Sequence, residues 1–208
     1  MHNDLSIELA KQVLIIDTEA SGLDPLYHSI LSIGLCPLMD KRYSQESNTP
    51  YKSQEAGLEI FVNEPCIHAD PQAMAIHGIT LEELKENGLS PLEACLRFED
   101  YLNQHFEQSV LLAGHNISFD LAFMKRLYRV AGRSWPKQLS HRTIDTHSLL
   151  WGLACTNHIP KSACSSDGAF KFFNCAPPEA LRHSALGDAL ATKTLLIKLL
   201  GLMRLDSN

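Results

Sequence analysis

Apolar residues in this chain gather into short runs separated by polar turns, the pattern expected of a sheet that helices cover. Four consecutive β-favouring residues at 13–16 predict a strand that is buried on both faces. Apolar runs at 30–36 and 58–62 predict two further strands, and the polar stretch 40–56 between them predicts a long hairpin loop. Three strands in such quick succession predict an antiparallel meander.

The rest of the chain alternates between helical and strand patterns. An Asp-Pro pair at 70–71, a capping box at 80–83 and a Ser-Pro pair at 90–91 each predict the start of a helix. The predicted helices cover 70–78, 80–88, 90–106, 121–132, 146–153 and 184–203, and the remaining strands cover 110–113 and 142–145. The stretch 156–168 is polar without a period, so we expect it to be irregular.

This order of elements predicts an α/β fold. Three antiparallel strands followed by right-handed parallel crossovers make a mixed five-stranded sheet flanked by helices. The chain has 208 residues, 45% of them hydrophobic, which suffices for one sizeable core. Because no repeat or linker interrupts the pattern, we expect a single domain over 1–208 with its core at about 11–203.

Acidic residues lie where the predicted parallel strands end. Asp17 and Glu19 are two positions apart at the end of the first strand, so on an extended chain they point to the same side. Asp120 follows the strand at 110–113, and ligands in such sheets gather at the carboxyl ends of parallel strands. Asp188 falls in the first turn or so of the last helix, just after His183. We expect these side chains to meet at one end of the sheet.

Such a group would suit metal-assisted phosphoryl chemistry. Clustered carboxylates are hard oxygen ligands that favour Mg²⁺ or Mn²⁺ over zinc. Two such ions roughly 3.5–4 Å apart can stabilise the attacking and leaving oxygens of an in-line displacement, while a nearby histidine takes the proton from water. Each residue alone has an ordinary explanation, since Asp17 and Glu19 could begin a solvated loop and Asp120 could start a helix.

Three stretches together resemble the motifs of a known family. The residues from Asp17 to Leu23, from Gly114 to Asp120 and from His183 to Asp188 resemble the three motifs of the DEDDh 3′–5′ exonucleases. That superfamily has the ribonuclease H-like fold and includes the DNA polymerase III epsilon (proofreading) subunit, ribonuclease T and oligoribonuclease. The resemblance covers about 13–200, and the run His-Gly-Ile-Thr at 77–80 resembles the epsilon and ribonuclease T branch.

The resemblance implies catalytic roles for five residues. Asp17, Glu19 and Asp188 would hold one Mg²⁺ or Mn²⁺ ion. Asp17 and Asp120 would hold a second. His183 would be the general base, and histidine at this position separates this branch from the one that uses tyrosine.

The resemblance also implies substrate contacts. The residues expected beside the substrate are Thr18, Ala20, Leu23, His77, His115 and Asn116. Leu23 would pack against the 3′-terminal base. Asp145, at the end of the strand 142–145, matches an acid outside the metal set, so we expect it to support the structure.

The chain departs from the family pattern at two places. Ala20 and Ser21 stand where the family often has two threonines, which would alter main-chain contacts to the terminal nucleotide. The stretch 157–178 lacks the regular helical pattern that usually precedes the histidine. We therefore expect His183 on a mobile loop.

Charge and cysteine usage narrow the function further. The net charge of −6 argues against a broad electrostatic nucleic-acid binder, although residues 121–144 contain six basic residues and no acid. This basic patch either faces a polyanion or is an ordinary solvated helix face. The six cysteines include no C-x-x-C pair, so a zinc-binding regulator fails on ligand spacing. No secretory signal or membrane span is predicted, which favours a cytoplasmic protein.

The sequence thus predicts a metal-dependent 3′–5′ exonuclease that acts on single-stranded 3′ ends and releases nucleoside 5′-monophosphates. The alternative is a catalytically silent module that keeps the fold and binds a partner through its basic patch. The intact set of four acids and a histidine counts against this alternative. The choice among DNA, RNA and short oligonucleotides stays open, as do homodimer formation and association with a polymerase.

Overall fold

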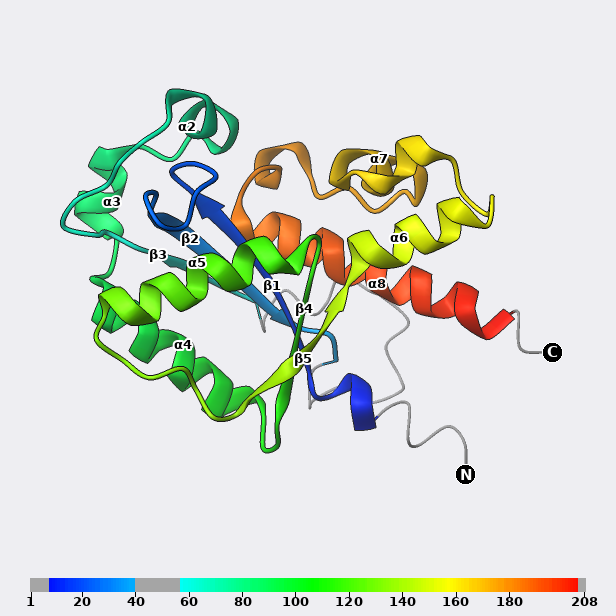
Figure 1. Ribbon diagram of the computed structural model, residues 1–208, viewed down its shortest axis with the longest axis horizontal. Coiled ribbons are helices and arrows are strands. Elements are labelled where there is room, and N and C mark those ends of the chain that lie inside the picture. Colours follow the sequence, from blue (N-terminus) through cyan, green and yellow to red (C-terminus); the bar gives the residue numbers. More distant parts are fainter. Residues whose placement is uncertain (1–7, 40–56, 206–208) are drawn as a thin grey trace.

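A five-stranded mixed sheet forms the centre of the computed structural model, which describes residues 8–39 and 57–205 (Figure 1). Its strands are β1 (Val13–Ala20), β2 (Ile30–Pro37), β3 (Leu58–Phe61), β4 (Val110–Gly114) and β5 (Leu139–Asp145), in the order β3-β2-β1-β4-β5. β1 pairs antiparallel with β2 and parallel with β4, and β5 is parallel to β4. The predicted fold class is confirmed. The predicted hairpin loop at 40–56 lies outside the described residues.

The helices follow the predicted order. They are α2 (Pro71–His77), α3 (Leu81–Asn87), α4 (Pro91–His105), α5 (Ile117–Val130), α6 (Thr146–Cys155), α7 (Ser166–Phe172) and α8 (Ala185–Leu205). α5 begins four residues earlier than predicted. Its N-cap, Asn116, has a left-handed backbone and no side-chain cap, so the sequence carries no capping signal for the start of this helix. β5 begins three residues earlier than predicted. It is an edge strand with exposed polar residues, and these give no apolar signal in the sequence.

The segment between α6 and α8 is more ordered than predicted. It contains the 3₁₀ turns η2 (Lys161–Cys164) and η3 (Glu179–Leu181) in addition to α7. Ile159, Phe170 and Cys175 pack against α6 and α8 in an apolar core of their own. The prediction of an irregular stretch at 156–168 holds for 156–160 but was wrong for most of 161–168, because helices of four and seven residues are too short to show a period.

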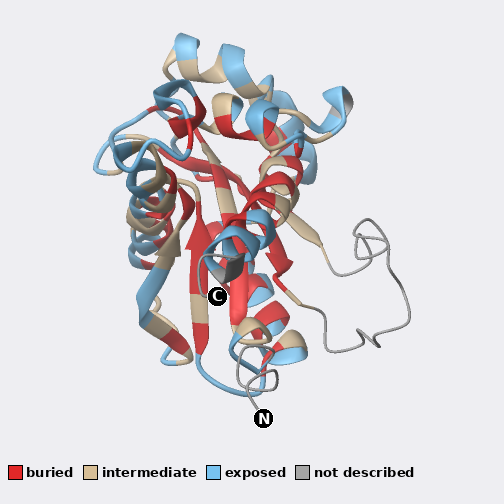
Figure 2. Cartoon of the chain, turned by 90° about the vertical axis from the view of Figure 1, so that its right-hand side faces the viewer, coloured by how far each residue is buried: buried red, intermediate tan, exposed pale blue. Residues whose placement is uncertain are grey.

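Alternate residues of β1 face two different layers of helices. Leu14 and Ile16 pack on the α4 and α5 side, whereas Val13 and Ile15 pack on the α8 side. The strand is therefore buried on both faces, as its apolar run predicts, and buried residues run through the centre of the molecule (Figure 2). Within the described ranges, no helix is long and apolar enough to cross a membrane.

Candidate active site

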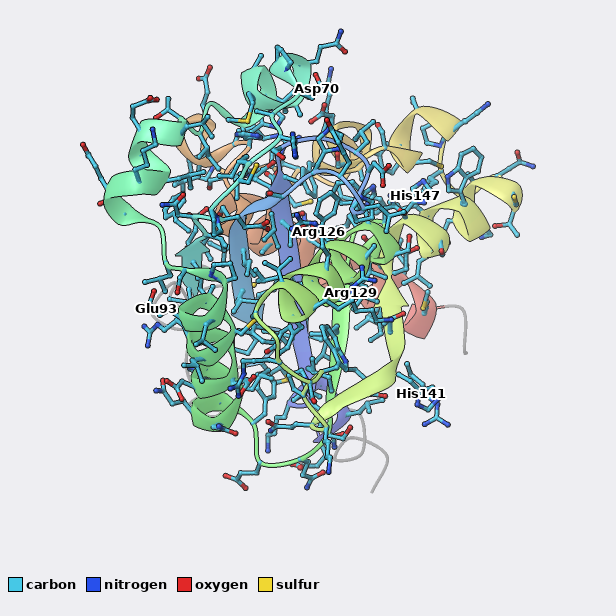
Figure 3. The ribbon with its side chains drawn as sticks, turned by 60° about the vertical axis from the view of Figure 1, so that its left-hand side comes forward. Asp70, Glu93, Arg126, Arg129, His141 and His147 are labelled. Atoms are coloured by element: carbon cyan, nitrogen blue, oxygen red, sulfur yellow. The ribbon has the colours of Figure 1, made fainter. Side chains whose placement is uncertain are left out.

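The carboxyl end of β1 projects beyond its parallel neighbour. The ladder between β1 and β4 ends at Ile15, while β1 continues to Ala20 along β2. Asp17 and Glu19 lie in this overhang and, by the alternation of the strand, on the α8 side. In both views of the ribbon, the tip of β1 lies between the α2 region and the α6–α7 region (Figures 1 and 3).

The first turn of α8 adds a third carboxylate. Oxygens of Asp17, Glu19 and Asp188 all lie within 4.8 Å of one another. This close approach depends on Gly34, which is opposite Asp17 in the β1–β2 ladder. A Cβ atom at Gly34 would lie 2.1 Å from the carbonyl group of Ala185, so the absence of a side chain lets α8 contact the sheet backbone.

Burial and neighbouring carboxylates destabilise the charges of Asp17 and Glu19. Burial, followed by repulsion from Asp120 and Glu19, raises the pKa of Asp17 well above its usual value. Burial and repulsion from Asp188 raise the pKa of Glu19 from 4.5 to about 8. Carboxylates in such a group become stable as anions when cations neutralise them.

One cation lies at this group already. The Arg182 guanidinium binds Asp188 on one side and Asp167, in the first turn of α7, on the other, and it lies 5.3 Å from the Phe170 ring centroid. Its charge lowers the pKa of Asp17 and Glu19, but less than burial raises them. Arg182 was not among the predicted site residues, and its only signal in the sequence is its place directly before the histidine motif.

The donor set fits a divalent metal ion. Asp188 binds Arg182 through Oδ2, while its Oδ1 is buried and accepts no hydrogen bond from the described residues. Three carboxylates with a free buried oxygen among them provide the hard ligands that Mg²⁺ and Mn²⁺ prefer.

Asp120 reaches the site from the other side of the sheet. It lies in the first turn of α5, is buried, and accepts a hydrogen bond of 2.8 Å from Thr18 Oγ1. Burial raises its pKa to about 7, although the Thr18 bond opposes the shift. Asp120 is outside the close group of three, yet near enough to raise the pKa of Asp17. The Thr18 hydroxyl thus positions Asp120.

His183 lies between η3 and α8 with a left-handed backbone, φ 62°. This conformation is uncommon for a residue with a side chain, and such strain concentrates at functional sites. Its charge acts on His77 of α2 and on Asp167 of α7. Burial lowers the pKa of His77, with His183 as a smaller cause.

Asp145 has a structural environment, as predicted. It is the N-cap of α6 and accepts hydrogen bonds from the backbone N–H of Asn116 at 2.8 Å and from Ser148 Oγ at 2.6 Å. Burial would raise its pKa, but these bonds outweigh it and lower the pKa. Asp145 thereby ties the β4–α5 turn, which carries His115 and Asn116, to the start of α6.

The predicted basic patch is partly neutralised. Arg126 forms a partly buried ion pair with Glu64 at 2.5 Å, and Arg133 pairs with Glu99 at 2.7 Å. Arg129 lies one turn beyond Arg126 on α5 and is exposed (Figure 3). Arg126 and Arg133 therefore stabilise the fold, and fewer charges than the sequence suggests face solvent.

Comparison with known proteins identifies the family. An exonuclease family model, RNase T, matches residues 14–196, which include all three motifs. The chain belongs to the RNase T family of exonucleases. It is therefore a nuclease, and the resemblance drawn from the motifs is confirmed.

Relatives of this exonuclease include a DNA exonuclease and proteins of DNA polymerase III. It is 31% identical to the 3′-5′ DNA exonuclease Cap18 of Escherichia coli over 69% of this chain and 71% of that protein. It is 27% identical to the DNA polymerase III subunit epsilon of Rickettsia conorii over 90% of this chain and 73% of that protein. A match to the PolC-type DNA polymerase III of Thermotoga petrophila covers 97% of this chain but 13% of that protein, at 28% identity.

Solved structures share the fold of this exonuclease at low identity. An exonuclease I structure has a TM-score of 0.68 at 15% identity, covering 94% of this chain and 44% of that chain. The nuclease domain of 3′hExo, described as a DEDDh family member bound to rAMP, also has a TM-score of 0.68, at 14% identity and 91% coverage of both chains. The exonuclease thus spans less than half of exonuclease I.

Proposed function

We propose that this exonuclease hydrolyses the terminal phosphodiester at the 3′ end of a single strand and releases nucleoside 5′-monophosphates. The group of Asp17, Glu19 and Asp188 carries this proposal, because three partly buried carboxylates within 4.8 Å of one another can bind a cation that offsets their repulsion. The names of Cap18 and the epsilon subunit support DNA as the strand. We also propose that residues 1–208 form a single exonuclease domain.

The proposed cofactor is a pair of Mg²⁺ or Mn²⁺ ions. Asp17, Glu19 and Asp188 would hold one ion, and Asp17 with Asp120 the other. Bound there, the ions would activate water and stabilise charge on the attacking and leaving oxygens. Asp120 suits this role because Thr18 holds its carboxylate in place.

His183 is the proposed general base. It directly follows Arg182, which binds both Asp188 and Asp167, and its charge acts on Asp167. Its role would be to accept a proton from the attacking water. The left-handed backbone at His183 supports a functional position, since η3 and α8 force the chain to turn there.

The proposed substrate residues come from three segments. Ala20 and Leu23 follow the acids directly, and Leu23 is 80% exposed, as a residue that packs against a terminal base would be. His77 of α2 forms a hydrogen bond with the backbone of Ala20, while His115 and Asn116 belong to the β4–α5 turn that Asp145 and Thr146 hold. Thr18 differs, because its hydroxyl binds Asp120; we propose main-chain contacts to the substrate there.

The test is digestion of a 5′-labelled strand with Mg²⁺ or Mn²⁺. We expect stepwise shortening from the 3′ end, lost with Asp17→Ala and in excess EDTA. A panel of single- and double-stranded DNA, structured RNA and dinucleotides under one set of conditions would establish the substrate. Undiminished digestion by Asp17→Ala would exclude the mechanism, and full activity of His183→Ala would exclude its role as the base.

A further inference from the structure

An exposed aromatic stack joins the β1–β2 loop, which carries Tyr27, to the segment between β3 and α2, which carries His68. The rings of Tyr27 and His68 are parallel to within 21°, with centroids 4.4 Å apart. Tyr27 and His68 are both exposed, Tyr27 to 57%. Leu26, next to Tyr27 in the chain, is 81% exposed. Soluble proteins rarely gather large apolar side chains on their surface without a binding role.

The loop is built to hold these side chains outward. Asp24 closes a turn by accepting the backbone N–H of Leu26 on its carboxylate, at 2.9 Å, and those of Tyr27 and His28 on its carbonyl. The ring of His28 fills the space beside Gly22, where a Cβ atom would lie 2.3 Å from the ring. These contacts fix the loop, so the exposure of Tyr27 is a property of its fold.

Ser21 connects the stack to the acids. This fully buried residue is two positions after Glu19, and its Oγ donates a hydrogen bond of 2.6 Å to the carbonyl of His68. Its own carbonyl accepts the backbone N–H of Asp70 at 2.7 Å, and its Oγ accepts that of Ser29. The loop and the segment that carries His68 are thereby held at a fixed place beside the metal-ligand strand.

Resting on the proposed function, we propose that Tyr27 and His68 form a stacking site for an unpaired base of the single strand, upstream of the terminal nucleotide. Aromatic rings bind bases through their faces with little sequence preference, which suits an enzyme that removes successive nucleotides. The site is separate from Leu23, whose expected contact is the terminal base. Asp24 and Asp70 cap backbone N–H groups, so their carboxylates are engaged in shaping the loop.

Two substrates separate this site from the catalytic centre. A single-stranded oligonucleotide presents upstream bases, whereas the p-nitrophenyl ester of thymidine 5′-monophosphate presents a scissile phosphodiester without them. For Tyr27→Ala we expect kcat/KM on the oligonucleotide to fall roughly tenfold, mostly through KM, with unchanged hydrolysis of the ester. Tyr27→Phe keeps the ring and should behave as wild type.

The matched control is Leu92→Ala, which removes another exposed apolar side chain, on α4. It should leave both substrates unaffected. Equal rates of Tyr27→Ala and wild type on the oligonucleotide, or equal losses on both substrates, would overturn the stacking site while leaving the proposed function intact. A wild-type protein that cleaves neither substrate with Mg²⁺ or Mn²⁺ would overturn the proposed function itself.

Discussion

At the scale of single residues, the site is a set of acids that repel one another. Burial raises the pKa of Asp17 and Glu19 because water, which would stabilise their charges, is excluded. Arg182 offsets part of this cost in the absence of metal. The acids therefore lower the stability of the free protein in order to bind cations, a trade that functional sites often show.

Removing one of these charges should stabilise the metal-free protein. Asp17→Asn keeps the size of the side chain and removes a carboxylate whose charge is opposed by burial, Asp120, Glu19 and Asp188. In EDTA we expect the Tm to rise by a few degrees, while the increase in Tm on adding Mg²⁺ is lost. Thermal unfolding with and without Mg²⁺ measures both effects, and a lower Tm in EDTA would contradict the prediction.

Replacing Arg182 tests whether it acts in place of a metal ion. Arg182→Gln removes the cation from Asp188 and Asp167, so the Tm in EDTA should fall by a few degrees. If Mg²⁺ displaces the guanidinium, the increase in Tm on adding Mg²⁺ should be larger in this variant than in wild type. Equal increases would show that Arg182 keeps its ion pair with Asp188 in the metal-bound state.

The sequence predicted that Asp17, Glu19 and Asp188 would come together, but it did not predict the ion pairs around them. Asp17, Glu19 and Asp188 were predicted because strand alternation and a helix start leave few places for them. The role of Arg182 was not predicted because an ion pair between separate segments leaves no periodic pattern in the sequence. The neutralisation of Arg126 by Glu64 escaped for the same reason, since 62 residues separate the partners.

At the scale of elements, the site depends on how closely α8 approaches β2. Gly34 makes this approach possible, and its place opposite Asp17 couples the helix to the catalytic strand. The apolar runs predicted the strands because buried strands are continuous in sequence. The short helix α7 and the polar edge strand β5 were missed or shortened because packing and hydrogen bonding, rather than pattern, define them.

Enlarging Gly34 should therefore affect stability and catalysis together. In Gly34→Ala the new methyl group would overlap the Ala185 carbonyl, pushing the first turn of α8 and Asp188 away from Asp17. We expect a decrease in Tm of at least several degrees and a loss of activity of about tenfold or more. Thermal unfolding and nuclease assays measure these effects.

Gly152→Ala is the matched control, because no atom lies within 4 Å of the new Cβ atom there. Gly152 lies inside α6, and alanine forms helices more readily than glycine. The stability of Gly152→Ala should therefore be unchanged or slightly higher. Wild-type behaviour of Gly34→Ala would contradict the proposed role of the close contact.

At the scale of the whole molecule, the site should make stability depend on pH. The raised pKa values of Glu19, about 8, and Asp120, about 7, mean that the folded metal-free protein binds more protons than the unfolded chain. Stability therefore falls as pH rises through this range. His77 and His115, whose pKa values are lowered by burial, act in the opposite direction below about pH 6.5.

Between pH 6.5 and 8, the effect of the raised carboxyl pKa values therefore dominates over that of the two histidines. In EDTA, urea unfolding should give a smaller free energy of unfolding at pH 8 than at pH 6.5. Saturating Mg²⁺ should reduce or reverse this difference, because the ion favours the deprotonated acids. A variant with Glu19→Gln and Asp120→Asn should show a weaker dependence, and an unaltered one would contradict the assignment.

The separate apolar core formed by α6, α7 and α8 has a consequence for how the molecule opens. Ile159, Phe170 and Cys175 pack away from the sheet, so α7 can unfold as a cooperative unit of its own while the strands stay paired. Such a local opening would release Asp167 and the support it gives to Arg182. Hydrogen exchange should then show α7 amides exchanging well before those of β1, because α7 can open while the sheet stays intact.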